Sequence, residues 1–345
     1  MTPLRILSEI AGCFSWKPRG CVPSLESLDA SHGVASKCEV TSLVGTPASS
    51  HPLTVVELVD GKIIGDLRMV STASNIVVGG LQSLFGCSDP QNHYLLRRKR
   101  FRMPKRRRGT ALLLGAANSD NYYHWLLDSV PRWKILQLAN WSNYDYVLLP
   151  WRALPFQDEI LDRLNVPMAK RLRCSKNFIH QFERLVVPAM PFPLEEVSEW
   201  ACAYVRSLFP EKTSGHEKVY LRRGAGRRQL VNEDELEEAL KEIGFISIQP
   251  HELSVAVQAG VLSSARRVVA PHGAALTNLI FSPPGALLLE LFHPQHKNRC
   301  YVNIAAACGH RYVGMDGFSN DRDGEAHLQY TVNIAAVLET LKNAA

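Results

Sequence analysis

The feature that most restricts the fold of this chain is a regular alternation of short apolar runs with amphipathic stretches. In the C-terminal part, strands are predicted at 219–221, 245–248, 267–270 and 287–291, and helices from residue 232 and over 253–262, 274–281, 298–308 and 332–341. The same rhythm begins earlier, with strands at 111–116, 146–149 and 184–187 and helices over 122–138 and 194–208. Strands that alternate with helices form parallel sheets covered by helices, so an α/β protein is predicted. Ligands of such sheets bind beyond the carboxyl ends of the strands.

The length of 345 residues favours two domains. A polar stretch over 210–217 is the best candidate for a linker. We expect four segments: an irregular N-terminal segment (1–50), an N-terminal Rossmann-like domain (51–209), a C-terminal Rossmann-like domain (216–330) and a closing helix (331–345). Asp60-Gly61 predicts a tight hairpin turn between two strands. Asn232 and Glu235 have the spacing of a capping box.

The composition is that of a folded soluble protein, with 46% hydrophobic and 21% charged residues. No run approaches the ~20 apolar residues of a membrane span, and the first residues lack a signal-peptide pattern. Eight cysteines include no C-x-x-C pair, which favours free thiols over a zinc site or a disulfide framework. These patterns predict a cytoplasmic protein.

The positive charge of the chain is concentrated in Arg97–Arg108, which holds nine basic residues and no acidic one. Such a block attracts phosphate-rich partners, so a peripheral contact with the inner face of the plasma membrane or with a lipid-linked acceptor is one interpretation. A solvated loop is the competing interpretation. Nucleic acid is disfavoured, because no binding module or aromatic platform surrounds the block.

A turn of small residues follows the predicted strand at 267–270. Gly273, Ala274 and Ala275 leave their backbone accessible at the start of a predicted helix, where N–H groups and the helix dipole attract anions. The turn therefore predicts a site for a diphosphate held without metal. An ordinary tight turn, with His272 as a structural histidine, is the alternative.

Charged residues also stand at the ends of two other predicted strands. Arg222 and Arg223 follow 219–221, where adjacent guanidinium groups can pair with phosphate oxygens. A surface ion pair with the acidic helix that follows is the alternative for these arginines. Glu290 is the only charged residue of its strand, and such a carboxylate can accept hydrogen bonds from a ribose. A solvent-facing charge is the alternative for Glu290.

A polar helix face is predicted in the N-terminal domain. His124 and Asp128 are spaced i, i+4 and share that face, with Asn121 one turn earlier. Either His124 or Asp128 can serve as the general base that a hydroxyl nucleophile requires. A satisfied buried polar pair is the alternative.

No metal site is predicted. Asp321 and Asp323 form a D-x-D pattern but lie in a polar loop. His293 and His296 lack companion ligands. We therefore expect no metal requirement.

Taken in order, several motifs resemble glycosyltransferase family 61, which includes bacterial capsular-polysaccharide, plant xylan-decorating and animal N-acetylglucosaminyl transferases. The motifs are Asn121-Tyr-Tyr-His-Trp-Leu-Leu-Asp-Ser-Val-Pro-Arg, Tyr220-Leu-Arg-Arg, Val231-Asn-Glu, Ala270-Pro-His-Gly-Ala-Ala-Leu-Thr-Asn, Pro284-Gly-Ala and Glu290-Leu. The resemblance implies a GT-B architecture, with two Rossmann-like domains that face a central cleft. It also implies inversion at the anomeric carbon and no obligatory cofactor.

The resemblance further implies roles for individual residues. Arg222 and Arg223 would contact the donor phosphates, with Asn232 also at the donor. His272, Gly273, Ala274 and Ala275 would line the diphosphate, with Thr277 and Asn278 behind them and Glu290 facing the nucleoside. Asn121 and Tyr122 would lie on the acceptor side of the cleft.

The sequence thus predicts an inverting, metal-independent glycosyltransferase that uses a nucleotide-sugar donor, with UDP as the expected nucleotide. Its acceptor would be a glycan or lipid-linked glycan in bacterial polysaccharide or capsule biosynthesis. The alternative is a non-catalytic protein that binds a nucleotide sugar or a polyanion. An NAD-dependent enzyme is disfavoured, because no G-x-G-x-x-G follows a predicted strand.

Overall fold

The computed structural model describes residues 20–22, 29–40, 53–67, 69–78, 103–175, 178–192, 196–210, 215–224, 228–319 and 329–344. The chain divides into two compact units, Met1–Leu194 and Glu195–Ala345. Each unit combines a sheet with helices, which confirms the predicted α/β class. In the described part of the chain, no helix has both the length and the apolar character that a membrane span requires.

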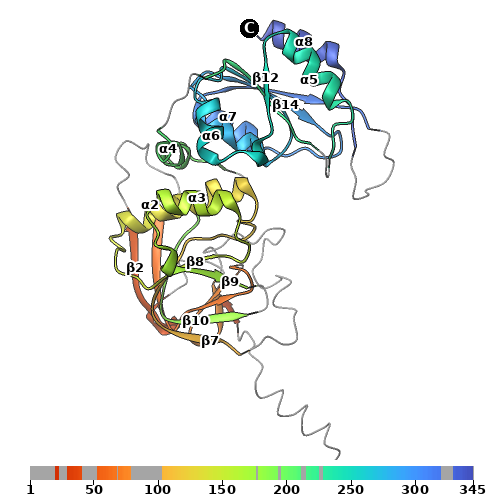
Figure 1. Ribbon diagram of the computed structural model, residues 1–345. Coiled ribbons are helices and arrows are strands. Elements are labelled where there is room, and N and C mark those ends of the chain that lie inside the picture. Colours follow the sequence, from red (N-terminus) through yellow and green to blue (C-terminus); the bar gives the residue numbers. More distant parts are fainter. Residues whose placement is uncertain are drawn as a thin grey trace, which may run out of the picture. The chain divides into compact units, whose positions relative to one another are not determined.

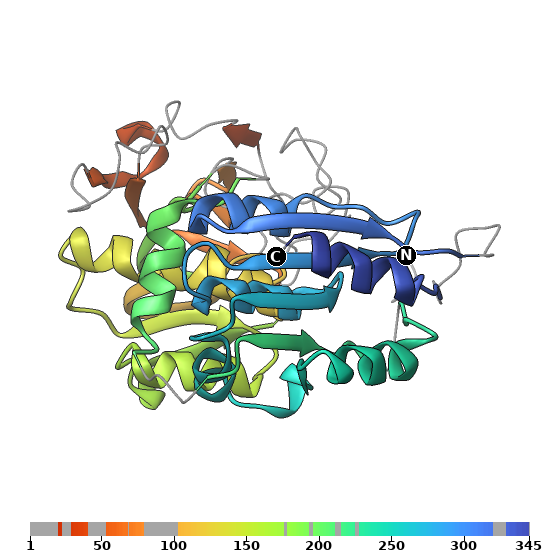
Figure 2. The same cartoon turned by 90° about the horizontal axis from the view of Figure 1, so that it is seen from above.

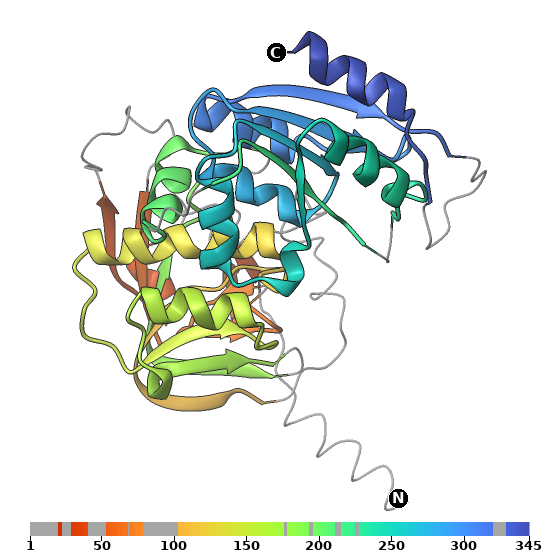
Figure 3. The same cartoon turned by 45° about the horizontal axis from the view of Figure 1, so that its top comes forward.

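The N-terminal unit is built on a mixed sheet of ten strands among the described residues. Its main order is β1-β6-β5-β4-β10-β7-β8-β9, while β3 pairs with β10 and β2 pairs with β3. Helices α2 (Val130–Leu138) and α3 (Pro155–Arg163) lie on the same face of this sheet (Figures 1 and 3). The strands are β1 (Gly20–Val22), β2 (Val34–Val40), β3 (Leu53–Val59), β4 (Lys62–Ile64), β5 (Met69–Ser71), β6 (Ile76–Val78), β7 (Lys105–Leu113), β8 (Tyr146–Pro150), β9 (Arg171–Cys174) and β10 (Ile179–Pro188), with short 3-10 turns at η1 (Ala30–His32) and η4 (Met168–Lys170).

The direction of these strands follows from their connections. Strands β7, β8 and β9 run parallel because α2 and α3 provide the crossovers between them. Strands β3, β4 and β5 are joined by short turns, and their pairings are antiparallel. The sheet is therefore mixed, whereas the alternation of strands and helices after residue 111 predicted parallel strands. Strands β1 and β2 also join it, although the first fifty residues were predicted to be irregular.

The predicted hairpin at Asp60-Gly61 is wrong. Strands β3 and β4 do not pair with each other; both pair with β10, which continues along them from Ile179 to Pro188. Asp60 has a φ of 52°, and its N–H donates to the carbonyl of Glu183 at 3.0 Å. An aspartate tolerates this left-handed backbone between two strands that pair with the same neighbour as well as in a hairpin turn, so the dipeptide alone does not distinguish the two.

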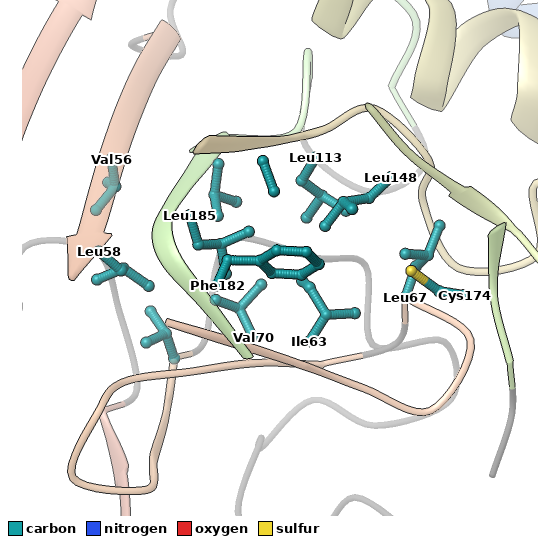
Figure 4. Packing of buried hydrophobic residues seen from close by; sticks show 13 residues of the cluster. Val56, Leu58, Ile63, Leu67, Val70, Leu113, Leu148, Cys174, Phe182 and Leu185 are labelled. Carbon is teal, nitrogen blue, oxygen red and sulfur yellow. The ribbon is translucent and has the colours of Figure 1, made fainter. Parts of the chain in front are cut away.

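The core of the N-terminal unit forms around Phe182 of β10. The buried side chains of this cluster come from the strands β3 to β10, apart from Leu67, which follows β4. Figure 4 shows the Phe182 ring between Leu113 and Leu148 on one side and Ile63 and Val70 on the other. This packing holds the parallel strands and the antiparallel strands in one sheet.

The C-terminal unit contains a five-stranded parallel sheet of order β12-β11-β13-β14-β15. In chain order this is 2-1-3-4-5, so the winding direction reverses between β11 and β13. Doubly wound sheets bind ligands at the carboxyl ends of the two strands that flank such a switch point. The strands are β11 (Lys218–Leu221), β12 (Ile246–Ile248), β13 (Arg267–Pro271), β14 (Leu287–Phe292) and β15 (Arg311–Asp316).

Helices cover both faces of this sheet. Helices α5 (Glu233–Glu242) and α8 (Ile334–Asn343) pack on one face, seen in front of the strands in Figure 2. The other face carries α4 (Glu199–Ser207), α6 (Val255–Leu262), α7 (Cys300–Cys308) and the 3-10 helix η6 (Ala274–Phe281), with the short turn η5 (Pro250–Glu252) before α6 (Figure 1). Ser254 and Asn333 cap α6 and α8 through their side chains.

The capping box predicted at Asn232 is wrong. Its side chain makes no cap bond; the amide instead donates to the carbonyl of Val332 at 2.9 Å and accepts from the N–H of the same residue at 3.1 Å. Asn232 therefore ties the segment before α8 to the start of α5. The acidic first turn of α5, Glu233 to Glu235, still suits the positive end of the helix dipole.

Candidate functional site

The loops after β11 and β13 meet at the switch point of the parallel sheet. One terminal nitrogen of Arg223 donates to the backbone carbonyl of His272. Gly273 permits this approach, because a Cβ at that position would lie 2.3 Å from the same nitrogen of Arg223. The structure thus brings Arg223, His272 and Gly273 together, three residues that the sequence selected from separate motifs. Burial lowers the pKa of the Arg223 guanidinium.

Glu233, which the sequence did not select, holds the Arg223 loop in place. This buried carboxylate accepts hydrogen bonds from the N–H of Arg223 at 2.7 Å, the N–H of Gly224 at 3.0 Å and the hydroxyl of Tyr220 at 3.0 Å. A carboxylate with several N–H and O–H donors fixes its partners strongly, since charge-assisted bonds are the stronger class. The only sequence signal was its place in the Val231-Asn-Glu motif.

Arg222 points to a different set of partners. Its two terminal nitrogens donate to Glu237 at 2.5 Å and to Asp234 at 2.6 Å, both on α5. These are the ion pairs with the acidic helix that we considered as the alternative. A role for Arg222 as a phosphate ligand stays a prediction, and it would require exchange of these ion pairs for a ligand.

His272 and Glu290 form a buried pair beneath the Arg223 loop. The Nδ1 atom of His272 lies 2.5 Å from one carboxylate oxygen of Glu290, and the other oxygen accepts from the hydroxyl of Tyr312 at 2.9 Å. The His272 ring also stacks on Phe292, with centroids 5.2 Å apart. Glu290 has no exposed surface, so a direct bond to a ribose, as predicted, would require a change of this arrangement. Its nucleoside role stays a prediction.

The helix after Gly273 is a 3-10 helix over Ala274–Phe281, not the α-helix that the sequence predicted. Its hydrogen bonds are less well aligned than those of an α-helix, so its dipole attracts an anion less strongly. The backbone N–H groups of Gly273, Ala274 and Ala275 nevertheless have no acceptor among the described residues, and the two alanines are partly exposed. Three donors are thus available beside Arg223 for a ligand.

Thr277 and Asn278 lie on the inner side of this helix. Both side chains are buried, and the amide of Asn278 donates to Gln258 of α6 at 2.6 Å. Their predicted place behind the residues that line a diphosphate stays a prediction. Asn232 uses both of its amide atoms on Val332, as described above, so its predicted donor contact stays a prediction.

The N-terminal unit carries the second group of predicted residues. The Nδ1 atom of His124 lies 2.8 Å from a carboxylate oxygen of Asp128, so the two side chains share one face as expected. The predicted single helix is interrupted there: His124–Ser129 (η3) forms a π-helix that leads into α2. Such bulges often occur at functional sites. The His124 side chain is 22% exposed and that of Asp128 only 7%, so His124 is the more accessible of the two.

A buried arginine stands behind this pair. Arg132 is fully buried, and one of its terminal nitrogens donates to the carbonyl of Gly115 at 3.2 Å. Burial lowers its pKa to about 10, while the charge of Asp128 acts in the opposite direction. The guanidinium of Arg132 thus stands close to the carboxylate of Asp128. Arg132 is the last residue of the motif that begins at Asn121, but nothing in the spacing of that motif indicated a role for Arg132.

Asn121 and Tyr122 precede the π-helix. The side chain of Asn121 accepts the N–H of Tyr123 at 2.9 Å, and the ring of Tyr122 meets that of Phe156 edge to face, with centroids 5.3 Å apart. Burial raises the pKa of Tyr122. Asn121 is exposed and Tyr122 partly so; their role toward an acceptor stays a prediction.

Comparison with known proteins shows which family this part of the chain resembles. Residues 122–289 match the family model Glycosyltransferase 61, a stretch that includes His124, Arg223 and His272. Over this stretch the chain is similar to glycosyltransferase family 61. The resemblance inferred from the motifs is therefore confirmed.

The chain is also similar to three animal proteins named EGF domain-specific O-linked N-acetylglucosamine transferase. It is 31% identical to the Gallus gallus protein and 32% identical to the Mus musculus protein, each over 98 residues, which are 27% of this chain and 18% of the relative. It is 33% identical to the Drosophila melanogaster protein over 124 residues, which are 33% of this chain and 24% of that relative. The chain thus matches about a fifth of the length of these relatives.

The basic block lies N-terminal to the family 61 region. Its first part, residues 97–102, lies outside the described residues, and Lys105 to Arg108 begin strand β7. The Lys105 ammonium stands 4.0 Å from the centre of the Phe178 ring, and the Arg107 guanidinium 5.7 Å from that of Tyr146. This end of the block is therefore a strand and not a loop, with Lys105, Arg106 and Arg108 exposed. A contact with an anionic membrane stays a prediction.

The structure describes only one of the two patterns that the sequence analysis considered and rejected as metal sites. Asp321 and Asp323 lie outside the described residues. His293 is buried after β14, and its Nδ1 atom accepts the N–H of Gln295 at 3.2 Å. His296 lies against His272, with ring centroids 5.4 Å apart. In the part of the chain that the structure describes, no three His, Cys, Asp or Glu side chains gather as a metal site would require.

Proposed function

We propose that this protein is an inverting glycosyltransferase that transfers a sugar from a nucleotide diphosphate donor to a hydroxyl acceptor. The observation that carries the proposal is the group of donors at the switch point, within the family 61 region. Arg223 and the N–H groups of Gly273, Ala274 and Ala275 lie together at the edge where parallel sheets bind ligands. A diphosphate is the ligand that such donors suit.

In this proposal the reaction is a single displacement. The acceptor oxygen bonds to the anomeric carbon while the bond from that carbon to the diphosphate oxygen breaks, with its electron pair left on the diphosphate. Arg223 and the backbone N–H groups stabilise the charge that develops there, an effect that is often the largest in enzyme catalysis. No metal is needed for this step. The pairing of the two units as in a GT-B enzyme is part of the proposal.

The proton of the acceptor goes to His124. Two observations favour His124 over Asp128 as the base. Its ring is the more exposed of the two, and its Nδ1 atom is held by Asp128, so the ring is oriented for its other nitrogen to accept the proton. Asp128 would then orient the imidazole and stabilise the imidazolium that forms.

The donor, the acceptor and the location extend this proposal. UDP is the expected nucleotide, and N-acetylglucosamine is the first sugar to test, since the relatives are named for its transfer. The acceptor proposed is a glycan or lipid-linked glycan of bacterial polysaccharide synthesis. The cytoplasmic location and the membrane contact of Arg97–Arg108 are proposals that fractionation of the expressed protein would test.

The decisive experiment measures donor binding and turnover. Wild-type protein is screened for thermal stabilisation by UDP, GDP, CMP and their sugars, and the nucleotide sugar that binds is then used in hydrolysis and transfer assays. Arg223→Ala is expected to lower kcat/KM about a hundredfold, since an oxyanion-stabilising contact contributes about 3 kcal/mol. Arg266→Ala is the matched control, because this exposed arginine precedes the opposite end of β13.

His124→Ala and Asp128→Asn test the base. We expect His124→Ala to abolish transfer while donor binding is kept. Asp128→Asn should lower kcat less, because the imidazole is still present. Near-normal rates in Arg223→Ala and in both of these variants would rule out the proposed site. Binding of a nucleotide sugar without any turnover by the wild type would favour the non-catalytic alternative.

A further inference from the structure

His296 is held at the edge of the candidate donor site. It lies four residues beyond the carboxyl end of β14, and its backbone N–H donates to the carbonyl of His293 at 2.9 Å. This turn directs its ring against that of His272, with centroids 5.4 Å apart and planes inclined by 62°. His296 is partly exposed, unlike His272 and His293, which are buried. It is therefore the histidine of this group that a ligand meets first.

Two arginines and two histidines stand around His296. Arg228 and Arg223 lie in the loop after β11, His272 at the end of β13, and His293 in the turn of His296 itself. Burial, followed by the effects of Arg228, His272, His293 and Arg223, lowers the pKa of His296 to about 4. At neutral pH the imidazole is therefore uncharged in the free protein, because a further positive charge in this cluster is unfavourable.

The acidic groups nearby do not neutralise this cluster at His296. Glu290 gives its two oxygens to His272 and Tyr312. Asp316 of β15 pairs with Lys297 at 2.7 Å. Tyr301 of α7 is the remaining titratable group against the His272 ring, and burial raises its pKa, so it carries no negative charge at neutral pH. Two arginines beside an uncharged imidazole favour the binding of an anion.

We propose that His296 is a ligand of the donor's diphosphate and that it takes up a proton when the donor binds. This proposal rests on the proposed function, because it assigns a further contact to the same donor site. The negative charge of a diphosphate reverses the effect of the neighbouring cations, so the charged imidazole becomes the favoured form. The imidazolium N–H then donates to a phosphate oxygen. When the sugar departs and the diphosphate gains charge, this bond becomes stronger.

The competing view is that His296 forms part of a metal site with His293. The two side chains have different surroundings, which disfavours this view. His293 packs its ring against Tyr330, with centroids 5.7 Å apart, and accepts from Gln295, so it forms the turn. His296 faces His272. His293 thus forms the turn, and this turn positions the ring of His296.

The test measures proton uptake when UDP binds. Titration calorimetry in buffers of different ionisation enthalpy at pH 7 gives the number of protons taken up per UDP bound. We expect wild-type protein to take up a substantial fraction of one proton, and its UDP affinity to fall as the pH rises from 6 to 8. His296→Asn should lose both effects and bind UDP about tenfold more weakly.

Two further variants complete the experiment. His296→Gln can donate a hydrogen bond but cannot take up a proton, so it should recover part of the affinity without the proton uptake. His216→Asn is the matched control, since His216 is exposed and precedes the opposite end of β11. It should behave as the wild type.

The outcomes separate the two proposals. If His296→Asn matches the wild type in affinity, proton count and pH slope, the role of His296 is refuted while the transferase proposal stands. If the wild type binds no nucleoside diphosphate and no nucleotide sugar, both proposals are refuted. A zinc-dependent, UDP-independent stabilisation that is lost in His296→Asn would favour the metal site instead.

Discussion

Replacement of Glu233 by glutamine tests whether this carboxylate organises the donor loop. One oxygen of Glu233 accepts from the Tyr220 hydroxyl and from the N–H of Arg223, and the other accepts from the N–H of Gly224. The side chain is 5% exposed, so water does not replace a lost partner easily. Glutamine has the same shape but only one acceptor oxygen.

The loss of stability that we expect in Glu233→Gln follows from these three hydrogen bonds. If the glutamine oxygen takes the place that serves Tyr220 and Arg223, its NH₂ group faces the N–H of Gly224, donor against donor. A buried donor without a partner costs about 1–3 kcal/mol, and the two bonds that remain lose their charge assistance, roughly 1 kcal/mol more. We therefore expect Glu233→Gln to lower the free energy of unfolding by about 2–4 kcal/mol. For a domain of this size that corresponds to a fall in Tm of about 5–10 °C.

Thermal unfolding followed by circular dichroism measures the fall. Hydrogen exchange of a peptide that contains Arg223 and Gly224 reports on the loop itself, whose amides should exchange faster in the variant. Glu235→Gln is the matched control, because it removes a charge from the same first turn of α5 at an exposed position. A Glu233→Gln protein with the Tm of this control and unchanged exchange would refute the reasoning.

Two further predictions concern single contacts. Gly273→Ala puts a methyl group where the guanidinium of Arg223 lies. This guanidinium is the end of a flexible side chain, so we expect it to shift, at a cost of about 1–3 kcal/mol in stability. The KM for the donor should rise several-fold in steady-state assays. A Tm and a KM equal to those of the wild type would contradict this. His180, stacked on Phe182 with both ring nitrogens buried and unpartnered, has its pKa lowered to about 4 by burial, followed by Arg107 and Lys105. Stability from the neutral ring is present above the unfolded pKa of about 6.5 and is lost as the pH falls toward 4. His180→Phe should therefore reduce the fall in Tm between pH 7.5 and 5, and an unchanged pH dependence would contradict this.

The sequence predicted four of the five strands of the C-terminal sheet, because these are short apolar runs between clear helices. It missed β15, whose residues are exposed or only partly buried. Parallel pairing and the order of elements follow from that rhythm, and the ends of β13 and β14 agree with prediction to within one residue. The predictions of local structure were wrong where the same residues fit two different backbone arrangements. Asp60-Gly61 fits a hairpin and a break between two strands that both pair with β10, and Asn232 can bond to the backbone of Val332 as readily as to its own helix.

The site shows the same division. Arg223 and His272 were predictable because each follows a strand, and parallel strands end at one edge. Their direct contact was not predictable, because it depends on Gly273 having no side chain and on which way Arg223 turns. Arg222 illustrates the limit: it has the same residue type and the adjacent position, yet it pairs with α5. Neighbours on a chain that leaves a strand point in different directions, and only tertiary contacts decide which one faces a ligand.

The buried acids explain why one of these arginines is held at the edge of the sheet. Glu233 holds the backbone of the Arg223 loop and Glu290 holds the ring of His272, so each carboxylate fixes one element of the pair without occupying its outer face. Both carboxylates are buried. The backbone N–H groups after His272 are the hydrogen-bond donors that remain for a ligand. The loop and helix that hold these groups do not need to reorganise when charge develops on the ligand. Preorganisation of this kind is what allows such a site to stabilise a leaving diphosphate, because the cost of orienting the dipoles is met when the protein folds.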